Sequence, residues 1–251
     1  MKNKINAKFA TAVRATVAAA FIGVAGASVA LAGPAAATDH GNPSPFVPST
    51  GSTPTTSSMY GNPSAAAKYW AEQKYDDCAL MAVADIVGQV TGHEPSEQDM
   101  ITLAENTPSK SHPGSVYMVP ANPKDPNSGQ GTDPGDISLL LAHYNIQSTT
   151  TDAQNGSRGS AGIDALEQAL SAGKGVIAGV NGETLWNSPD GQRNEADHAV
   201  VVTGIDTKNG IVHLNDSGTP DGKDEQVPLS TFMKAWATSD YQMTITQQTV
   251  K

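Results

Sequence analysis

The sequence QKYDDCALMAVADIV occupies residues 73–87 and contains the only cysteine of the chain, Cys78. Apolar residues follow the cysteine at the spacing of one helix face, at Leu80, Val83, Val87 and Val90. This spacing predicts a helix that begins at the cysteine and ends at Gly92. The thiol would lie in the first turn, where free N–H groups and the helix dipole favour a thiolate. Cys78 is therefore a candidate nucleophile, and the alternative is a small residue of the buried core.

Three polar residues near the cysteine bear on its reactivity. Asp77 is a favourable N-cap, and we expect the carboxylates of Asp76 and Asp77 to be solvated, so that their repulsion of a thiolate is screened. Five residues before the cysteine, the side-chain amide of Gln73 could donate to a developing oxyanion. Such a nucleophile also needs a base and a group that orients the base, which must come from elsewhere in the chain.

Residues 1–37 are predicted to be a secretory signal peptide. Their start is basic, with Lys2, Lys4, Lys8 and Arg14, and a small, apolar run follows at 15–31. Two small-residue cleavage sites place the start of the mature chain at Gly33 or Thr38. A membrane anchor is the alternative, because the run is close to the shortest length that spans a bilayer. We expect a secreted, extracellular protein, or one held at the cell envelope, with no membrane span after cleavage.

The remaining chain divides into a linker at 38–63 and a folded domain at 64–251. The linker is rich in Pro, Ser, Thr and Gly, a composition that predicts disorder. Signal cleavage removes four basic residues and no acidic ones, so the mature chain is more acidic than the net −10 of the whole sequence. That charge argues against binding nucleic acid or an anionic membrane surface. A monomer is expected.

Helical patterns dominate the first half of the domain, and strand patterns dominate the second. Besides the cysteine helix, helices are predicted at 65–72, 97–105, 136–144 and 163–170, with a short one after Ser230. Strands are predicted at 146–151, 176–180, 199–202, 211–214, 225–229 and 241–246. The run 199–202 is apolar on both faces, so it should be the central strand. Residues 107–135, rich in proline and glycine, indicate a long loop beside a cleft. The order predicts an α+β fold.

His198 is the candidate base, because it opens the predicted central strand, where rigid backbone would hold it at the rim of the sheet. A hydrogen-bonded structural histidine is the alternative. The next strand ends at Asn215 and Asp216, and either side chain could accept from the imidazole and fix its tautomer. A two-residue turn at 209–210 would place Asn215 on the face of His198, whereas a three-residue loop with a bulge would place Asp216 there. Periodicity does not choose between them.

Three segments together resemble the bacteriocin-processing cysteine peptidases, which cleave double-glycine leaders and belong to the papain-like superfamily. The segments are Gln73 with the following Asp77-Cys78, the run DHAVVVTGID at 197–206, and VHLNDS at 212–217. The chain is most similar to secreted, free-standing relatives of those peptidases. The resemblance implies a papain-like fold, in which a helical half with the nucleophile helix packs on a twisted, mostly antiparallel sheet.

The resemblance also implies a role for each candidate residue. Cys78 would be the nucleophile, His198 the base and Asp216 the residue that orients the base. Gln73 and the Cys78 backbone N–H would form the oxyanion hole. Two positions depart from the family pattern, since Ala79 stands where glycine is usual and Ser217 stands where proline is usual. The founding members are fused to an ATP-driven exporter, but no Walker motif occurs here, so leader removal coupled to export is not expected.

The sequence is compatible with two functions, besides a plain structural or adhesin-like domain. The first is an exported cysteine peptidase-like thiol hydrolase that cleaves a peptide or amide bond through a Cys-His-Asp triad. Its substrate would be a peptide, a protein or cell-wall peptide. The second is a non-catalytic papain-like binding or virulence module with a vestigial triad. No cofactor or metal is expected, because the chain has one cysteine and lacks His-x3-His and His-Glu-x-x-His spacing.

Overall fold

The structure is a computed structural model that describes residues 58–122, 131–153, 162–188 and 191–251. The helices are α1 (Pro63–Ala66), α2 (Cys78–Thr91), α3 (Glu97–Glu105), α4 (Ile137–His143), α5 (Ile163–Ser171), α6 (Gly182–Leu185) and α7 (Leu229–Ala237). The strands are β1 (Met59–Gly61), β2 (Ser148–Thr151), β3 (Lys174–Val180), β4 (His198–Asp206), β5 (Ile211–Asn215), β6 (Glu225–Pro228) and β7 (Met243–Thr249). They form one antiparallel sheet in the order β2-β7-β3-β4-β5-β6, with β1 also paired to β4.

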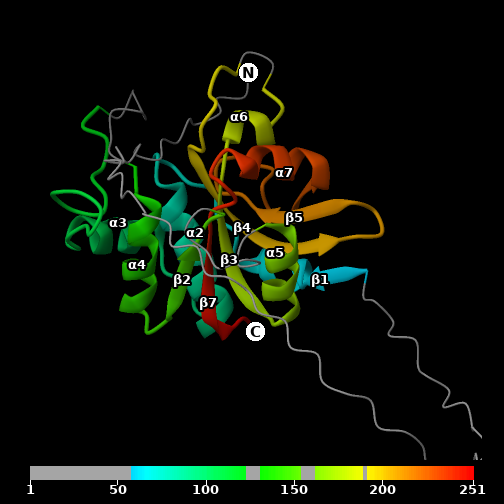
Figure 1. Cartoon of the computed structure of the whole chain (residues 1–251). Helices are drawn as coiled ribbons and strands as arrows, with labels where there is room; N and C mark the ends of the chain where they lie inside the picture. Colours follow the sequence, from blue (N-terminus) through cyan, green and yellow to red (C-terminus); the bar gives the residue numbers. More distant parts are fainter. Residues whose placement is uncertain (1–57, 123–130, 154–161, 189–190) are drawn as a thin grey trace, which may run out of the picture. The chain divides into compact units, whose positions relative to one another are not determined.

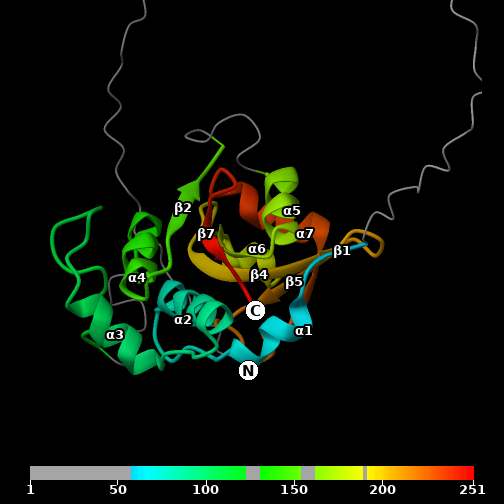
Figure 2. The same cartoon turned by 90° about the horizontal axis from the view of Figure 1, so that it is seen from below.

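Helices cover both faces of this sheet, as Figures 1 and 2 show. On one face, α2, α3 and α4 share a core with alternate strand residues, among them Ile177, Ala199 and Val201. On the other face, α5 and α7 pack against the intervening residues, among them Ala178, Val200 and Val202. The period of two along β3 and β4 therefore divides the apolar residues between two cores. The α+β fold, with a helical half on an antiparallel sheet, is confirmed.

The helix that begins at Cys78 forms between the N-cap and the glycine that its sequence predicts. Asp77 holds the N-cap position, and Gly92 ends the helix in the left-handed conformation, with φ of 88°. Twelve of the fourteen residues of α2 are buried, because the helix lies between the sheet and α3 and α4. Because α2 is buried on all sides, it is the central helix of the core that it shares with α3 and α4.

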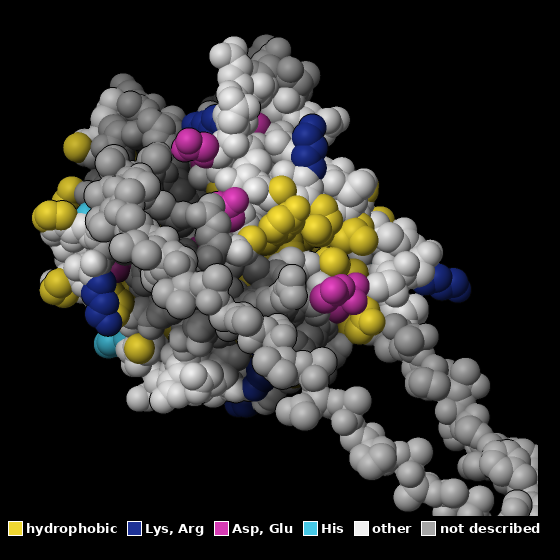
Figure 3. Space-filling view, in the orientation of Figure 1, with side chains coloured by type: hydrophobic (Ala, Val, Ile, Leu, Met, Phe, Trp, Pro, Cys, Tyr) yellow, Lys and Arg dark blue, Asp and Glu magenta, His cyan; other side chains and the backbone are white. Residues whose placement is uncertain are grey.

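The folded region begins before the predicted boundary at residue 64. β1 pairs with β4, and Asn62 caps α1, so residues 58–63 belong to the domain rather than to a linker. The predicted signal peptide and residues 38–57 lie outside the described residues. Within the described ranges, no helix has the length and apolar character needed to cross a membrane. On the face in Figure 3, apolar side chains gather near α5 and α7, while charged ones are scattered.

A bulge in β4 sets the register of the hairpin with β5. The turn spans 207–210, so it is longer than either alternative for this hairpin, the two-residue turn at 209–210 or the three-residue loop. Gly204 pairs with His213 and Val202 pairs with Leu214, which leaves Thr203 as an extra residue on β4. Beyond the bulge Asn215 lies opposite Val201, on the α2 face of the sheet. Asp216 follows on the His198 face, because one extra residue exchanges the two faces.

Candidate active site

The structure brings Cys78, His198 and Asp216 together from three elements. Cys78 is the first residue of α2, His198 the first residue of β4, and Asp216 follows β5 directly. The His198 Nε2–H donates to Asp216 Oδ1 at 2.6 Å. His198 and Asp216 are 1% and 0% exposed, and Cys78 is 5% exposed. The imidazole–carboxylate pair is therefore shielded from solvent, where its electrostatic attraction is strong.

The positive charge of His198 and the negative charge of Asp216 stabilise each other. Burial opposes the charged imidazolium, but the Asp216 carboxylate and the Cys78 side chain outweigh it and hold the pKa of His198 well above its usual range. Burial also opposes the Asp216 carboxylate, but His198 and hydrogen bonds from Trp186 and Gly218 keep its pKa below 3.8. His198 Nδ1 has no hydrogen-bond partner of ordinary geometry among the described residues, and Cys78 is a neighbour that raises the pKa of the ring.

Trp186 and Gly218 complete the surroundings of Asp216. The Trp186 Nε1–H donates to Asp216 Oδ2 at 2.8 Å, and the Gly218 N–H donates to Oδ1 at 2.8 Å. The Trp186 ring also lies against His198, with ring centroids 5.0 Å apart. A Cβ at Gly218 would come within 2.9 Å of both rings, so the close packing requires glycine. No local sequence signal points to Trp186, because it lies 30 positions before Asp216 in the chain.

Gln73 is held at this site by Ser217 and Tyr75. Its side-chain Nε2–H donates to the Tyr75 carbonyl at 2.7 Å, and its Oε1 accepts from the Ser217 hydroxyl at 2.8 Å. The Gln73 backbone N–H donates to the Ser217 carbonyl at 2.9 Å. An amide nitrogen carries two hydrogens, so one donor of Gln73 remains for an oxyanion. The Cys78 N–H, in the first turn of α2, is the second expected donor.

The expectation that Asp77 is solvated is wrong. Its side chain is 1% exposed and makes no capping bond, and neither carboxyl oxygen has a hydrogen-bond partner among the described residues. Burial, reinforced by Glu97 and Asp76, raises the pKa of Asp77 to about 8, and nearby backbone N–H groups lower it only in part. At neutral pH the side chain is therefore an uncharged acid. Protonation, and not solvent screening, removes its repulsion of a Cys78 thiolate.

The side chain of Asn215, the alternative to Asp216 as the orienting residue, is directed away from His198. Its Nδ2 donates to Asp85 Oδ2 at 2.6 Å and to the Ala66 carbonyl at 3.0 Å. Asp85 lies in α2 and also accepts from Gln89 at 2.5 Å. Asn215 thus links β5 to α2 in the interior, so it has a structural role that periodicity alone did not reveal.

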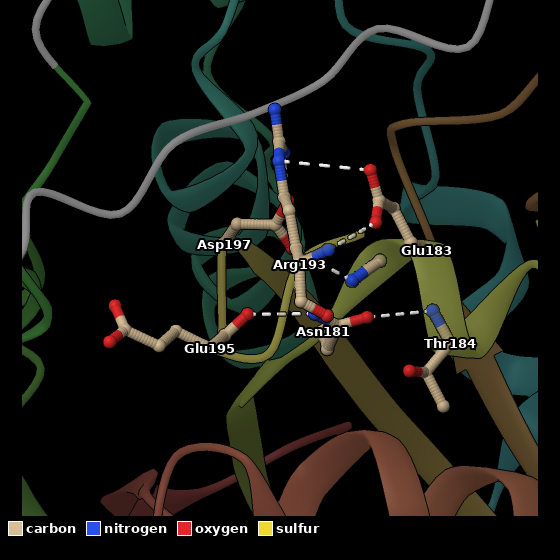
Figure 4. A network of polar contacts seen from close by, with 7 residues as sticks. Asn181, Glu183, Thr184, Arg193, Glu195 and Asp197 are labelled. Atoms are coloured by element: carbon tan, nitrogen blue, oxygen red, sulfur yellow. Dashed lines mark hydrogen bonds and ion pairs between the residues drawn. The ribbon is translucent and has the colours of Figure 1, made fainter. Parts of the chain in front are cut away.

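A polar network fixes the segment that leads into His198 (Figure 4). The Asn181 side chain donates to the carbonyls of Arg193 and Glu195, at 3.1 and 2.8 Å, and accepts from the Thr184 N–H at 2.7 Å. Asp197 accepts from the Gly182 N–H at 2.8 Å and pairs with Arg193. The network therefore ties the residue before His198 to α6, which in turn presents Trp186.

Two other features do not belong to this site. Within the described residues, no three His, Cys, Asp or Glu side chains gather in a way that could hold a metal ion. A cavity of about 430 Å³ lies between β1, the end of α5 and the last residues of the chain. None of the four candidate site residues lines it.

Comparison with known proteins places these residues in a family. The model of the Peptidase_C39 like family matches residues 69–244. Uncharacterized proteins of Mycobacterium tuberculosis and Mycobacterium bovis are 54% identical over 195 residues, which cover 75% of this chain and 84% of those proteins. A protein described as a C39-like peptidase from Bacillus anthracis has 17% identity and a TM-score of 0.49, over 69% of this chain and 90% of its own.

The SERA5 proenzyme from Plasmodium falciparum has 12% identity and a TM-score of 0.42, over 74% of this chain and 63% of its own. The family model spans both cores of the sheet and includes all four candidate site residues. The chain therefore belongs to the Peptidase_C39 like family.

Proposed function

We propose that the protein is an exported cysteine hydrolase that cleaves a peptide or amide bond, with Cys78 as nucleophile and His198 as base. The observation that carries the proposal is the buried His198–Asp216 pair, at 2.6 Å, beside a thiol at a helix N-terminus. A structural histidine needs no such arrangement next to the only cysteine of the chain. Residues 1–37 support the export, since they have the pattern of a signal peptide.

Each step of the proposed reaction has a candidate residue. The Cys78 thiolate attacks the substrate carbonyl carbon, a C–S bond forms, and the carbonyl oxygen takes the negative charge. Gln73 and the Cys78 N–H donate to that oxygen. His198 gives its proton to the leaving amine as the C–N bond breaks. Water then attacks the thioester while His198 accepts its proton, the C–S bond breaks and the acid product leaves, which regenerates the thiolate–imidazolium pair.

The test is turnover of a mixed-sequence fluorogenic peptide library and of cell-wall fragments. Wild type should cleave at least one of them, while Cys78→Ala and His198→Ala should lose nearly all activity. His213→Ala is the matched control, because His213 Nδ1 forms a similar pair with Asp224 at 2.8 Å, on another part of the sheet. Equal activity of wild type and Cys78→Ala would refute the proposal. A folded wild type that cleaves nothing would favour the binding module instead.

A further inference from the structure

Two consecutive residues after β5 hold two different parts of the site. Asp216 accepts from the base, His198, and Ser217 contacts the oxyanion donor, Gln73, through both its hydroxyl and its carbonyl. Gln73 and Ser217 are 2% and 7% exposed, so water does not compete strongly for these bonds. Ser217 is also one of the two departures from the family pattern, and the proposed reaction assigns it no role.

The chemistry of the partners determines which end of the Gln73 amide faces which neighbour. A carbonyl oxygen can only accept, so the Tyr75 carbonyl, at 2.7 Å, must face the amide nitrogen. The amide oxygen must then face Ser217, whose hydroxyl donates to it at 2.8 Å. Because hydrogen bonds hold both the nitrogen and the oxygen of the Gln73 side-chain amide, the plane of the amide is fixed. Its second N–H therefore points in a single direction. A mobile amide would instead spread that donor over many orientations.

We propose that Ser217 is a positioning residue that fixes the side-chain amide of Gln73 for oxyanion stabilisation. The inference rests on the proposed hydrolase function, and it adds Ser217 to the residues on which the rate depends. Its physical basis is preorganisation, because a donor that is already aimed at the developing charge needs no reorganisation during the reaction. Without the hydroxyl, the Gln73 oxygen is buried and unpaired, which favours movement of the amide.

The kinetic test uses the fluorogenic peptide that wild type cleaves fastest. Ser217→Ala should lower kcat by about tenfold with little change in KM, since one neutral hydrogen bond contributes about that much. Ser217→Thr keeps a hydroxyl and should recover most of the loss. In a Gln73→Ala background, Ser217→Ala should cost nothing more. Ser138→Ala, which removes a remote bond between Ser148 and Ser138, is the matched control. Additive losses of Ser217 and Gln73 would overturn the proposal.

A second measurement separates this inference from the enzyme proposal. In isotopically labelled Cys78→Ala protein, the side-chain NH₂ signals of Gln73 should be rigid on the nanosecond timescale, and Ser217→Ala should make them mobile. The chemical shifts of the His198 ring should stay unchanged in that variant. If the Gln73 amide remains rigid without the Ser217 hydroxyl, the inference fails even when wild type is active. If Ser217→Ala makes the Gln73 amide mobile but wild type cleaves no substrate, the positioning role of Ser217 stands and only the hydrolase function is refuted.

Discussion

Replacement of Asp77 by asparagine should change how stability depends on pH. Burial raises the pKa of Asp77 from 3.8 to about 8 in the folded protein. One pKa unit corresponds to about 1.4 kcal/mol, so the folded state disfavours the ionised side chain by about 6 kcal/mol relative to the unfolded chain. Below pH 4 both states keep the proton, and the carboxyl has no pH-dependent effect. Stability is then lost as pH rises from about 4 to about 8, because only the unfolded chain releases the proton.

The Asp77→Asn side chain is neutral at every pH, so the variant lacks this loss. Relative to wild type, its free energy of unfolding should increase by about 1.4 kcal/mol for each pH unit between pH 5 and pH 7. Urea unfolding followed by tryptophan fluorescence, at half-unit pH steps, measures the difference. The slope matters more than the offset, since any fixed packing cost of asparagine is the same at each pH.

Asp206→Asn is the matched control for this measurement. Asp206 is half-buried, and hydrogen bonds from Asn209 lower its pKa from the ordinary value, so the variant should follow wild type above pH 5. If the free energy of unfolding of Asp77→Asn also runs parallel to that of wild type between pH 5 and pH 7, Asp77 ionises normally in the folded protein. A neutral Asp77 would then not be the reason that a Cys78 thiolate is tolerated.

Four further predictions concern the site and the export. Alkylation of Cys78 by iodoacetamide should be faster at low pH in wild type than in His198→Ala, and reaction only in denaturant would contradict the active-site assignment. Asp216→Ala should abolish turnover, while Asn215→Ala should lower the urea midpoint and keep most of the activity; the reverse ranking would refute the assigned orienting residue. In Asp216→Asn the alkaline limb of activity should move to lower pH, because Asp216 holds the pKa of His198 above its usual range. N-terminal sequencing of exported protein should find a chain that starts at either predicted cleavage site, and an intact start in the membrane fraction would indicate an anchor.

Local sequence signals were sufficient for the elements that carry the nucleophile and the base. The helix from Cys78 to Gly92 follows from apolar spacing and a left-handed glycine, which act within a few residues. His198 opens the central strand because the valines that follow it are apolar on both faces, and β3 and β5 do flank β4. β1 and α6 were missed, since β1 lies in the stretch assigned to the linker and α6 is a single helical turn of four residues.

The sequence by itself determined the nucleophile helix, the strand that begins with His198 and the choice of fold class. Only the tertiary structure decided whether Asp216 or Asn215 meets the histidine, because the bulge at Thr203 sets the faces of the hairpin. That bulge lies beside β1, and the Thr203 carbonyl accepts from the Asn62 N–H at 3.0 Å. The charge state of Asp77 was decided in the same way, by burial and by repulsion from Glu97 in α3, which both raise its pKa. Strand register and desolvation arise between segments far apart in the chain, so local residue patterns do not contain them.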